Sequence, residues 1–187
     1  MVSIITYYWA EYEKYFKECL QSIDLQTYKD FEVIVEKEKT DLSSARNSGI
    51  RRAKGDWILT LDVDDLILPD FLEKTVGKGD IVATSHQDNG VIGRVSQTVE
   101  LKDFLQCNQI IAGSLFKKEI WEKIDGFDEK MTDGYEDWDF WIRALKAGYK
   151  VVTIEEPLYV YRKHPDSMIS KTVQKDADIR KYIYSKL

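Results

Sequence analysis

Short apolar runs alternate with amphipathic stretches over the first 65 residues of the chain. The runs at 2–6, 31–35 and 57–61 have strand length and end at turn signals. Between the first two runs, apolar residues recur at three- and four-residue spacing: Phe16, Cys19, Leu20 and Ile23. That spacing predicts a helix with one buried face.

A second helix is expected before the third run. Ser43 or Ser44 can cap its start, and Gly55 follows Lys54 as a stop signal. Strand, helix, strand, helix, strand is the order in which right-handed crossovers build a parallel sheet with helices on its faces. The first third of the chain therefore predicts a nucleotide-binding-like α/β architecture.

The pattern after residue 65 is less regular and predicts an antiparallel edge. Apolar stretches at 81–85 and 91–98 flank Asn89-Gly90, which is a hairpin signal. Three more strands are expected, at 110–116, 151–154 and 158–161. Helices are expected at 118–124, at 136–146 with Gly148 as its stop, and at 171–187, where the helix is mostly polar.

Composition limits the class of protein. With 187 residues and 43% hydrophobic content, the chain fits one domain with a full-sized core. A net charge of −6, with basic and acidic residues interleaved, argues against nucleic acid as a partner. No apolar stretch approaches the roughly 20 residues of a membrane span. The cytoplasm is the expected location, and Cys19 and Cys107 are expected to be two unrelated core thiols.

An acidic cluster follows the third apolar run directly. Asp62, Asp64 and Asp65 stand where ligands bind in open α/β sheets, at a strand end. Three carboxylates so close together repel one another, and a hard divalent cation would offset that charge. The alternative is that Asp64 and Asp65 cap the helix expected after Leu68-Pro69.

Seven segments, in their order and approximate spacing, resemble the GT-A glycosyltransferases of the family 2 type. They are residues 2–8, 19–28, 45–50, 62–65, 126–129, 136–139 and 161–164. The resemblance covers most of the chain and implies an α/β GT-A (nucleotide-diphospho-sugar transferase) fold, with a central, mostly parallel sheet flanked by helices and a small antiparallel edge. It implies a single domain, 1–187, whose parts are a nucleotide-binding part (1–65), an acceptor and catalytic part (66–170) and a C-terminal helix (171–187).

The same resemblance implies metal-dependent transfer of a sugar from a nucleotide-diphosphate-sugar donor to an acceptor hydroxyl, with inversion. Asp62-Val63-Asp64 takes the place of the family's DxD motif. Asp64 would bind Mn²⁺ or Mg²⁺, and Asp62 would contact the donor ribose or reach the metal through water. His164 is a candidate third ligand, and a surface histidine is the competing interpretation.

Asp137 matches the aspartate of the family's ED motif and is the candidate general base. Glu136 would orient the acceptor or raise the pKa of Asp137 by repulsion. Trp138 and Trp141 would stack on sugar faces or belong to the core. The alternative for the carboxylates is that they merely favour the positive end of a helix dipole.

The donor would be held by the turn after the first strand. Thr6, Tyr7 and Tyr8 would cradle the base and ribose, with core tyrosines as the competing interpretation. Arg46 would meet the nucleotide or its phosphates. Glu36 stands where the family usually has an aspartate that contacts the base, and the segment 36–44 is short for the family.

Other functions remain open on sequence alone. Asp62 and Asp64 also resemble the nucleophile and acid of haloacid-dehalogenase-type phosphatases, and a non-catalytic sugar-nucleotide-binding module would keep the same fold. The acceptor would be a carbohydrate, free, lipid-linked or protein-linked, and the oligomeric state is open. The resemblance implies a shortened version of the family, and such shortened versions include virus-encoded proteins. If this chain were one of them, its expected location would be the host cytoplasm.

Overall fold

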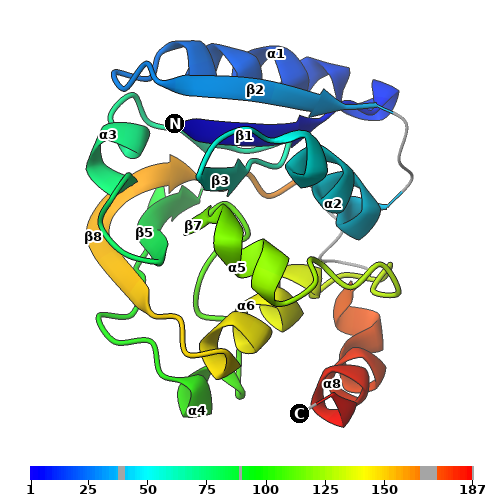
Figure 1. The fold of residues 1–187 in the computed structure, drawn as a ribbon. Helices are drawn as coiled ribbons and strands as arrows, with labels where there is room; N and C mark the ends of the chain where they lie inside the picture. Colours follow the sequence, from blue (N-terminus) through cyan, green and yellow to red (C-terminus); the bar gives the residue numbers. More distant parts are fainter. Residues whose placement is uncertain (38–40, 89, 165–171, 187) are drawn as a thin grey trace.

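One curled sheet carries the strands of this computed structural model, which describes residues 1–37, 41–88, 90–164 and 172–186 (Figure 1). The strand order is β2-β1-β3-β7-β5-β8-β4, and β6 pairs with β5. The strands are β1 (Val2–Tyr7), β2 (Phe31–Glu36), β3 (Trp57–Thr60), β4 (Leu66–Ile67), β5 (Ile81–Asp88), β6 (Val91–Gly93), β7 (Leu115–Lys117) and β8 (Val151–Val160).

The first third of the chain folds as predicted. β1 is parallel to both β2 and β3, and α1 (Glu13–Asp24) and α2 (Leu42–Arg52) make the connections. Ile4 packs in one core cluster with Cys19 of α1, and Ile5 packs in a second cluster with Ala45 of α2. Because successive side chains of a strand point to opposite faces, the two helices cover opposite faces of the sheet.

The cap of α2 differs from the prediction. Asp41 is the N-cap residue, and its carboxylate accepts a hydrogen bond from the Ser44 backbone N–H at 2.8 Å. The helix ends at Arg52, because Ala53 is already extended with φ −63° and ψ 135°. Ser43, one of the two expected caps, is buried inside the first turn instead.

The second part of the sheet is mixed, with a long parallel pair and short antiparallel ones. β5 runs parallel to β8, whereas β3–β7, β5–β7, β4–β8 and the hairpin β5–β6 are antiparallel. The two strands predicted at 151–154 and 158–161 are one strand, β8. Its register against β5 jumps from Ile154 to Pro157, and a bulge at Glu155 and Glu156 accounts for the break in the pattern. The mostly parallel sheet with a small antiparallel edge is thus confirmed by the β5–β6 hairpin, and β7 adds antiparallel pairing in the middle of the sheet, between β3 and β5.

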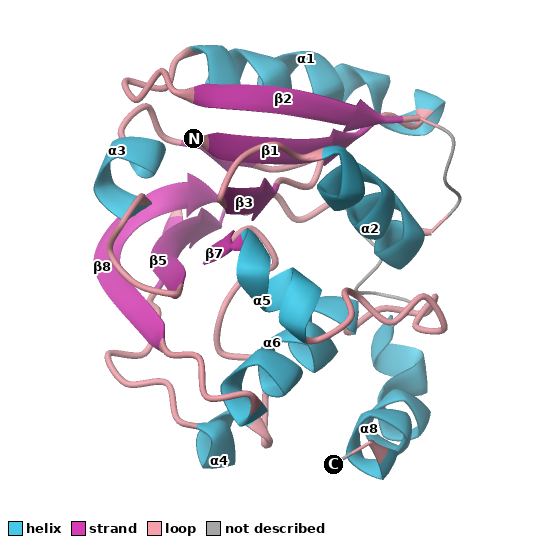
Figure 2. Cartoon of the chain, viewed as in Figure 1, coloured by secondary structure: helices cyan, strands magenta, loops and turns pink. Residues whose placement is uncertain are grey.

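The strand predicted at 110–116 was too long, since only Leu115–Lys117 pair as β7. The preceding residues form an irregular loop at the end of the sheet. The remaining helices are α3 (Phe71–Thr75), α4 (Leu101–Phe104), α5 (Lys118–Lys123), α6 (Glu136–Lys146) and α8 (Asp176–Ser185), with 3₁₀ turns at Ala10–Tyr12 and Val173–Lys175. Figure 2 shows α4, α6 and α8 gathered at the end of the molecule away from β1 and β2.

The bounds of α6 agree with the prediction at both ends. Tyr135 precedes it in the left-handed region, with φ 60°, and Gly148 follows it with φ 94°. Among the described residues, no helix combines the length and the apolar character needed to cross a membrane.

A buried asparagine joins α2 to the loop before α6. The Asn47 amide donates to the Phe127 carbonyl at 2.8 Å, and its oxygen accepts from the Trp121 indole and the Phe127 N–H, each at 2.8 Å. The loop comes this close because Gly126 has φ 71°, and a Cβ there would lie 2.7 Å from the Asn47 oxygen. Asn47 therefore supplies partners for the Trp121 indole and for both backbone polar groups of Phe127.

We predict that Asn47→Ala lowers the free energy of unfolding by roughly 2–4 kcal/mol, because two donors and a carbonyl lose their partner. Ser48→Ala, one position along the same helix, is the matched control and should change it by less than about 0.5 kcal/mol. Denaturant unfolding measures both. Equal losses in the two variants would contradict the bridging role of Asn47.

Candidate active site

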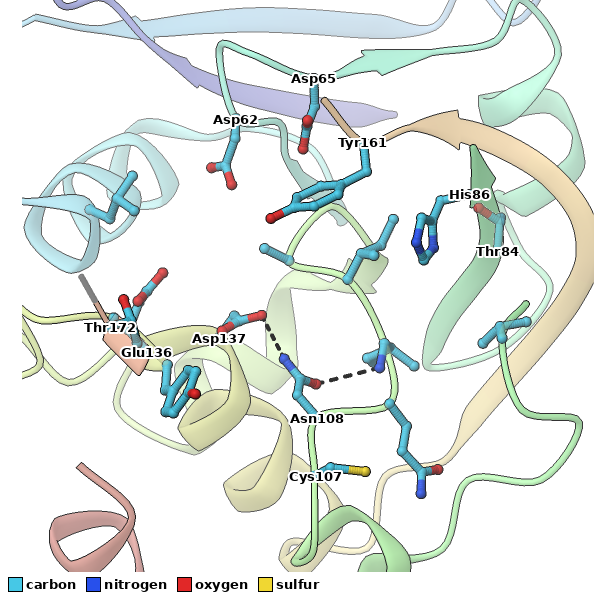
Figure 3. A pocket seen from close by; sticks show the side chains of 18 of the residues that line it. Asp62, Asp65, Thr84, His86, Cys107, Asn108, Glu136, Asp137, Tyr161 and Thr172 are labelled. Carbon is cyan, nitrogen blue, oxygen red and sulfur yellow. Dashed lines mark hydrogen bonds between the residues drawn. The ribbon is translucent and has the colours of Figure 1, made fainter. Parts of the chain in front are cut away.

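A cavity of 660 Å³ opens where β3, β5 and β8 end and α6 begins. The residues that line it are both polar and apolar: Leu42, Arg46, Asp62, Asp65, Thr84, His86, Arg94, Val95, Ser96, Cys107, Asn108, Gln109, Ile110, Ile111, Ala112, Gly134, Tyr135, Glu136, Asp137, Tyr161 and Thr172. Figure 3 shows Asp62 and Asp65 on one side of it and Asp137 on the other, with the Tyr161 ring between them. Asp62 and Asp65 of the acidic turn therefore share one space with the candidate base, whereas Asp64 and His164 are not among the lining residues.

A buried arginine links the two sides of the cavity. The Arg46 side chain is 1% exposed. Its guanidinium donates to Asp62 Oδ1 at 3.0 Å, to Glu136 Oε1, and to the Tyr7 hydroxyl at 3.3 Å. It thus connects the end of β3, the first residue of α6 and the end of β1, and each carboxylate offsets the cost of burying the cation.

The acidic turn divides its carboxylates between two tasks. Asp65 is buried, and it accepts hydrogen bonds from the Tyr159 hydroxyl at 2.7 Å and the Arg162 N–H at 2.9 Å. It ties the turn to the end of β8. Asp62 keeps a quarter of its side chain exposed, and withdrawal from water raises its pKa to about 6 against the opposing effect of Arg46.

Asp64 meets the predicted histidine. Asp64 Oδ2 lies 3.0 Å from His164 Nε2, and the His164 ring stacks on Tyr15 with 4.9 Å between the ring centroids. Neither Asp64 nor Asp65 caps α3, which begins at Phe71 with Asp70 at its N-cap. The capping alternative is therefore excluded, and Asp64 and His164 come together from segments 100 residues apart.

The donor atoms of this turn suit a hard divalent cation, since carboxylate oxygen and imidazole nitrogen are both ligands for Mn²⁺. Within the parts of the chain that the structure describes, no three His, Cys, Asp or Glu side chains are grouped closely enough to hold an ion by themselves. Asp64 and His164 would supply two ligands, and the remaining positions would need oxygens from a substrate or water.

Asp137 lies half-buried at the first turn of α6. Desolvation raises its pKa to about 7, the repulsion of Glu136 acts in the same direction, and Arg46 opposes both. Asn108 donates to Asp137 Oδ2 at 2.8 Å. A carboxyl that loses its proton near neutral pH at the wall of a cavity is suited to general base catalysis.

Several predicted donor-binding residues lie outside the cavity lining. Thr6 and Val63 are buried in the core, and the Tyr7 hydroxyl is held by Arg46. Tyr8, beyond the end of β1, bonds Glu13 through its hydroxyl. Glu36 ends β2 with its carboxylate paired to Arg52.

The structure places both tryptophans of α6 in the core and corrects the expectation for one cysteine. Trp138, for which the sequence left acceptor stacking and the core open, is 1% exposed, and its indole donates to the Phe104 carbonyl at 2.7 Å. It packs α6 against α4, and Trp141 is likewise buried. Cys107, expected in the core, is exposed and lines the cavity, so only Cys19 is a core thiol.

Asn108 is the polar contact of Asp137 that sequence reasoning missed. It lies in the irregular loop between α4 and β7, where no periodicity marks which side chains point inward. His86 and Thr84 on β5 also line the cavity without having been predicted. Their alternate spacing along an expected strand was the one available signal, since it places both on the same face.

Two family models match the chain. The model described as glycosyl transferase family 2 matches residues 33–95, and one described as the N-terminal domain of galactosyltransferase matches residues 101–166. The first match contains the Asp62 turn, and the second contains Asn108, Asp137 and His164.

Named relatives agree with these matches. The chain is 29% identical to an uncharacterized glycosyltransferase of Methanocaldococcus jannaschii over 87% of its own length and 70% of that protein. It is 25% identical to the uncharacterized glycosyltransferase EpsJ of Bacillus subtilis, over 83% of this chain and 59% of EpsJ.

Solved structures show the fold. S. aureus TarS in complex with UDP-GlcNAc superposes with a TM-score of 0.73 at 19% identity, over 90% of this chain and 60% of that one. The mannosyltransferase PcManGT from Pyrobaculum calidifontis, in complex with GDP-Man and Mn²⁺, gives 0.63 at 18% identity, over 95% of this chain and 64% of that one. The chain spans between 59% and 70% of the length of these four proteins.

The family models and the relatives are of glycosyltransferases, and the solved structures share the architecture: the chain is similar in sequence to family 2 glycosyltransferases and has the GT-A fold.

Proposed function

We propose that this glycosyltransferase moves a sugar from a nucleotide-diphosphate donor to an acceptor hydroxyl, with inversion and with Mn²⁺ or Mg²⁺ bound. The observation that carries the proposal is the shared cavity, in which the acidic turn and Asp137 face each other across the Arg46–Glu136 link. UDP-GlcNAc and GDP-Man, bound in two structures of the same fold, support a nucleotide-sugar donor.

The donor side of the site is the turn after β3. Asp64 and His164 would hold the cation, and Asp62 would contact the donor ribose or the cation through water. When bound, the cation neutralises the diphosphate and assists its departure. Arg46 adds positive charge behind Asp62, although its donors are already engaged by three partners on the protein.

The base-recognition roles of Thr6, Tyr7, Tyr8, Val63 and Glu36 stay proposals. Two members of this group, Tyr7 and Tyr8, have a ring. Tyr7 is buried, whereas Tyr8 is only half-buried and its hydroxyl contact to Glu13 is exposed. Lys37 lies 5.7 Å from the centroid of the Tyr8 ring. A ring in such a place can stack on a nucleobase. Thr6, Tyr7 and Val63 would act through the backbone or by supporting the turns.

The transfer itself needs one proton acceptor. The acceptor oxygen bonds to the anomeric carbon while the bond from that carbon to the diphosphate oxygen breaks. The acceptor proton passes to Asp137, and the nucleoside diphosphate leaves with the electron pair of the broken bond. Attack from the side opposite the leaving group would invert the configuration, and the positions of Asp62 and Asp137 on opposite sides of the cavity support this geometry.

The acceptor would enter on the Asp137 side of the cavity, which Asn108 also lines (Figure 3). A carbohydrate acceptor, free or carried on a lipid or protein, has the hydroxyl that this chemistry requires. No finding favours the phosphatase alternative, in which Asp62 would be the nucleophile; Asp62 Oδ1 is engaged by Arg46. The binding-module alternative is likewise without support from the comparisons.

We predict that kcat/KM for transfer rises with pH through about 7, because Asp137 must be ionised to accept the proton and its pKa is raised to about 7. Asp137→Asn should lower kcat by about 10²–10⁴-fold and spare donor binding. Release of the nucleoside diphosphate from a panel of nucleotide sugars, with Mn²⁺ and candidate acceptors, measures both effects. Retention of the wild-type rate by Asp137→Asn would refute the assignment of the base.

A second prediction concerns the metal. Donors should raise the melting temperature of the protein more with Mn²⁺ than without it, because a ligand that binds only the native state stabilises that state. Asp64→Ala should abolish the Mn²⁺-dependent part of this rise. Asp24→Ala removes an exposed carboxylate of α1 and is the control that should leave it intact. If Asp64→Ala keeps the full Mn²⁺ effect, the cation binds elsewhere.

A further inference from the structure

Asn108 and Asp137 form the contact from which this inference starts. Asn108 Nδ2 donates to Asp137 Oδ2 at 2.8 Å, across 29 residues of sequence (Figure 3). Both residues line the cavity. We propose that Asn108 is a positioning residue that holds Asp137 Oδ2 and so leaves Oδ1 as the atom that takes the acceptor proton. This inference rests on the proposed function of Asp137.

The amide of Asn108 is itself held in orientation. Its oxygen accepts from the Ile110 N–H at 3.4 Å, within the same loop. That contact directs the NH₂ end of the side chain toward Asp137, because an amide whose oxygen is engaged can offer only its nitrogen to a second partner. An ionised carboxylate has no proton to donate, so the end of the Asn108 amide that faces Asp137 must be its NH₂ group.

The loop that carries Asn108 is anchored to two helices. Trp138 of α6 donates to the Phe104 carbonyl at 2.7 Å. From α8, the Tyr184 hydroxyl donates to the Leu105 carbonyl at 2.7 Å, and Arg180 donates to the Gln106 carbonyl at 2.9 Å. Three successive carbonyls are thus fixed just before Asn108, one of them by the residue that follows Asp137.

Anchoring of this kind limits how far Asn108 can move relative to the base. Arg180 also lies over the Trp138 ring, 4.5 Å from its centroid, so α8 holds the loop and α6 together. Positioning matters for a base because a displacement of about 1 Å can cost about 10²-fold in rate. The buried Trp138 therefore contributes to the site through this loop.

The charges around Asp137 explain why a neutral amide suits this place. Glu136 and Arg46 face it from α6 and α2, Tyr135 precedes it, Tyr161 approaches from the end of β8, and Asp62 lies across the cavity. Burial and Glu136 raise the pKa of Asp137, whereas Arg46, the Trp138 backbone N–H and the hydrogen bond from Asn108 favour the ionised carboxylate and lower that pKa. A lysine would lower it further and weaken the base, whereas an aspartate would add repulsion.

The test compares Asn108→Ala and Asn108→Asp with the wild type. Asn108→Asp keeps the size of the side chain, removes the donor and adds the repulsion of a second carboxylate, whereas Asn108→Ala removes the donor without adding a charge. Gln106→Ala truncates an exposed amide on the same loop and is the matched control. The first readout is the pH titration of the Asp137 carboxyl ¹³C resonance, assigned by its absence in Asp137→Asn; the second is kcat and kcat/KM for nucleotide-sugar turnover.

We expect the titration midpoint of Asp137 to move to higher pH in both Asn108 variants and to stay in place in Gln106→Ala. With it, the acid limb of kcat/KM should move to higher pH, and kcat should fall roughly 10- to 100-fold with the donor KM within about twofold. An unchanged Asp137 titration in folded Asn108→Ala would overturn the inference.

The two proposals fail differently. If Asp137→Asn loses turnover but both Asn108 variants keep the wild-type rate and pH profile, the positioning role of Asn108 is refuted and the base assignment stands. If Asp137→Asn itself turns over normally, the proposed function fails. The ¹³C titration would then refute or support the Asn108–Asp137 contact independently of activity.

Discussion

The Arg46 guanidinium, buried beneath the cavity floor, is the interaction on which the geometry of the site depends. Removing a cation from water costs several kcal/mol, and good geometry with every donor engaged is needed to offset that cost. Asp62 and Glu136 provide the two carboxylates and Tyr7 a third partner. These residues come from the ends of β1 and β3 and the start of α6, so one side chain bridges the acidic turn and the first turn of α6.

The divided use of neighbouring carboxylates follows from that constraint. In the acidic turn, Asp65 accepts a hydrogen bond from Tyr159, and one oxygen of Asp62 accepts a hydrogen bond from Arg46. Asp64 is the remaining carboxylate, and it faces His164. At the start of α6, Glu136 is committed to Arg46, and Asp137 is left at the cavity wall with a pKa of about 7. In both places a buried acid, Asp65 or Glu136, makes the structural contacts, and a neighbouring acid, Asp64 or Asp137, has the proposed chemical role.

Sequence patterns predicted the parts of the fold that local signals control. The bounds of α6 agreed with the prediction because Gly148 and the spacing of apolar residues mark this helix clearly. The β2-β1-β3 arrangement was predicted because apolar residues recur with one period in strands and another in helices. The family resemblance suggested that Asp64 and His164 bind the same cation, and the fold brings their side chains together.

The misses share one cause, which is that contact partners distant in the chain decide the outcome. Residues 110–114 are apolar enough for a strand, yet they form a loop that lines the cavity. Trp138 was expected at the acceptor because it adjoins Asp137, but a helix turns by 100° per residue, and its ring faces the core. Asn108 carries no local signal, because its role depends on a helix 29 residues later.

The most direct test of the bridging role of Arg46 is a double-mutant cycle on unfolding free energy with Arg46→Met and Glu136→Gln. The account predicts that each single change costs roughly 3–5 kcal/mol and that the two are coupled by about 1–3 kcal/mol. Additive losses, within about 0.5 kcal/mol, would contradict the claim that Arg46 joins the two sides of the site.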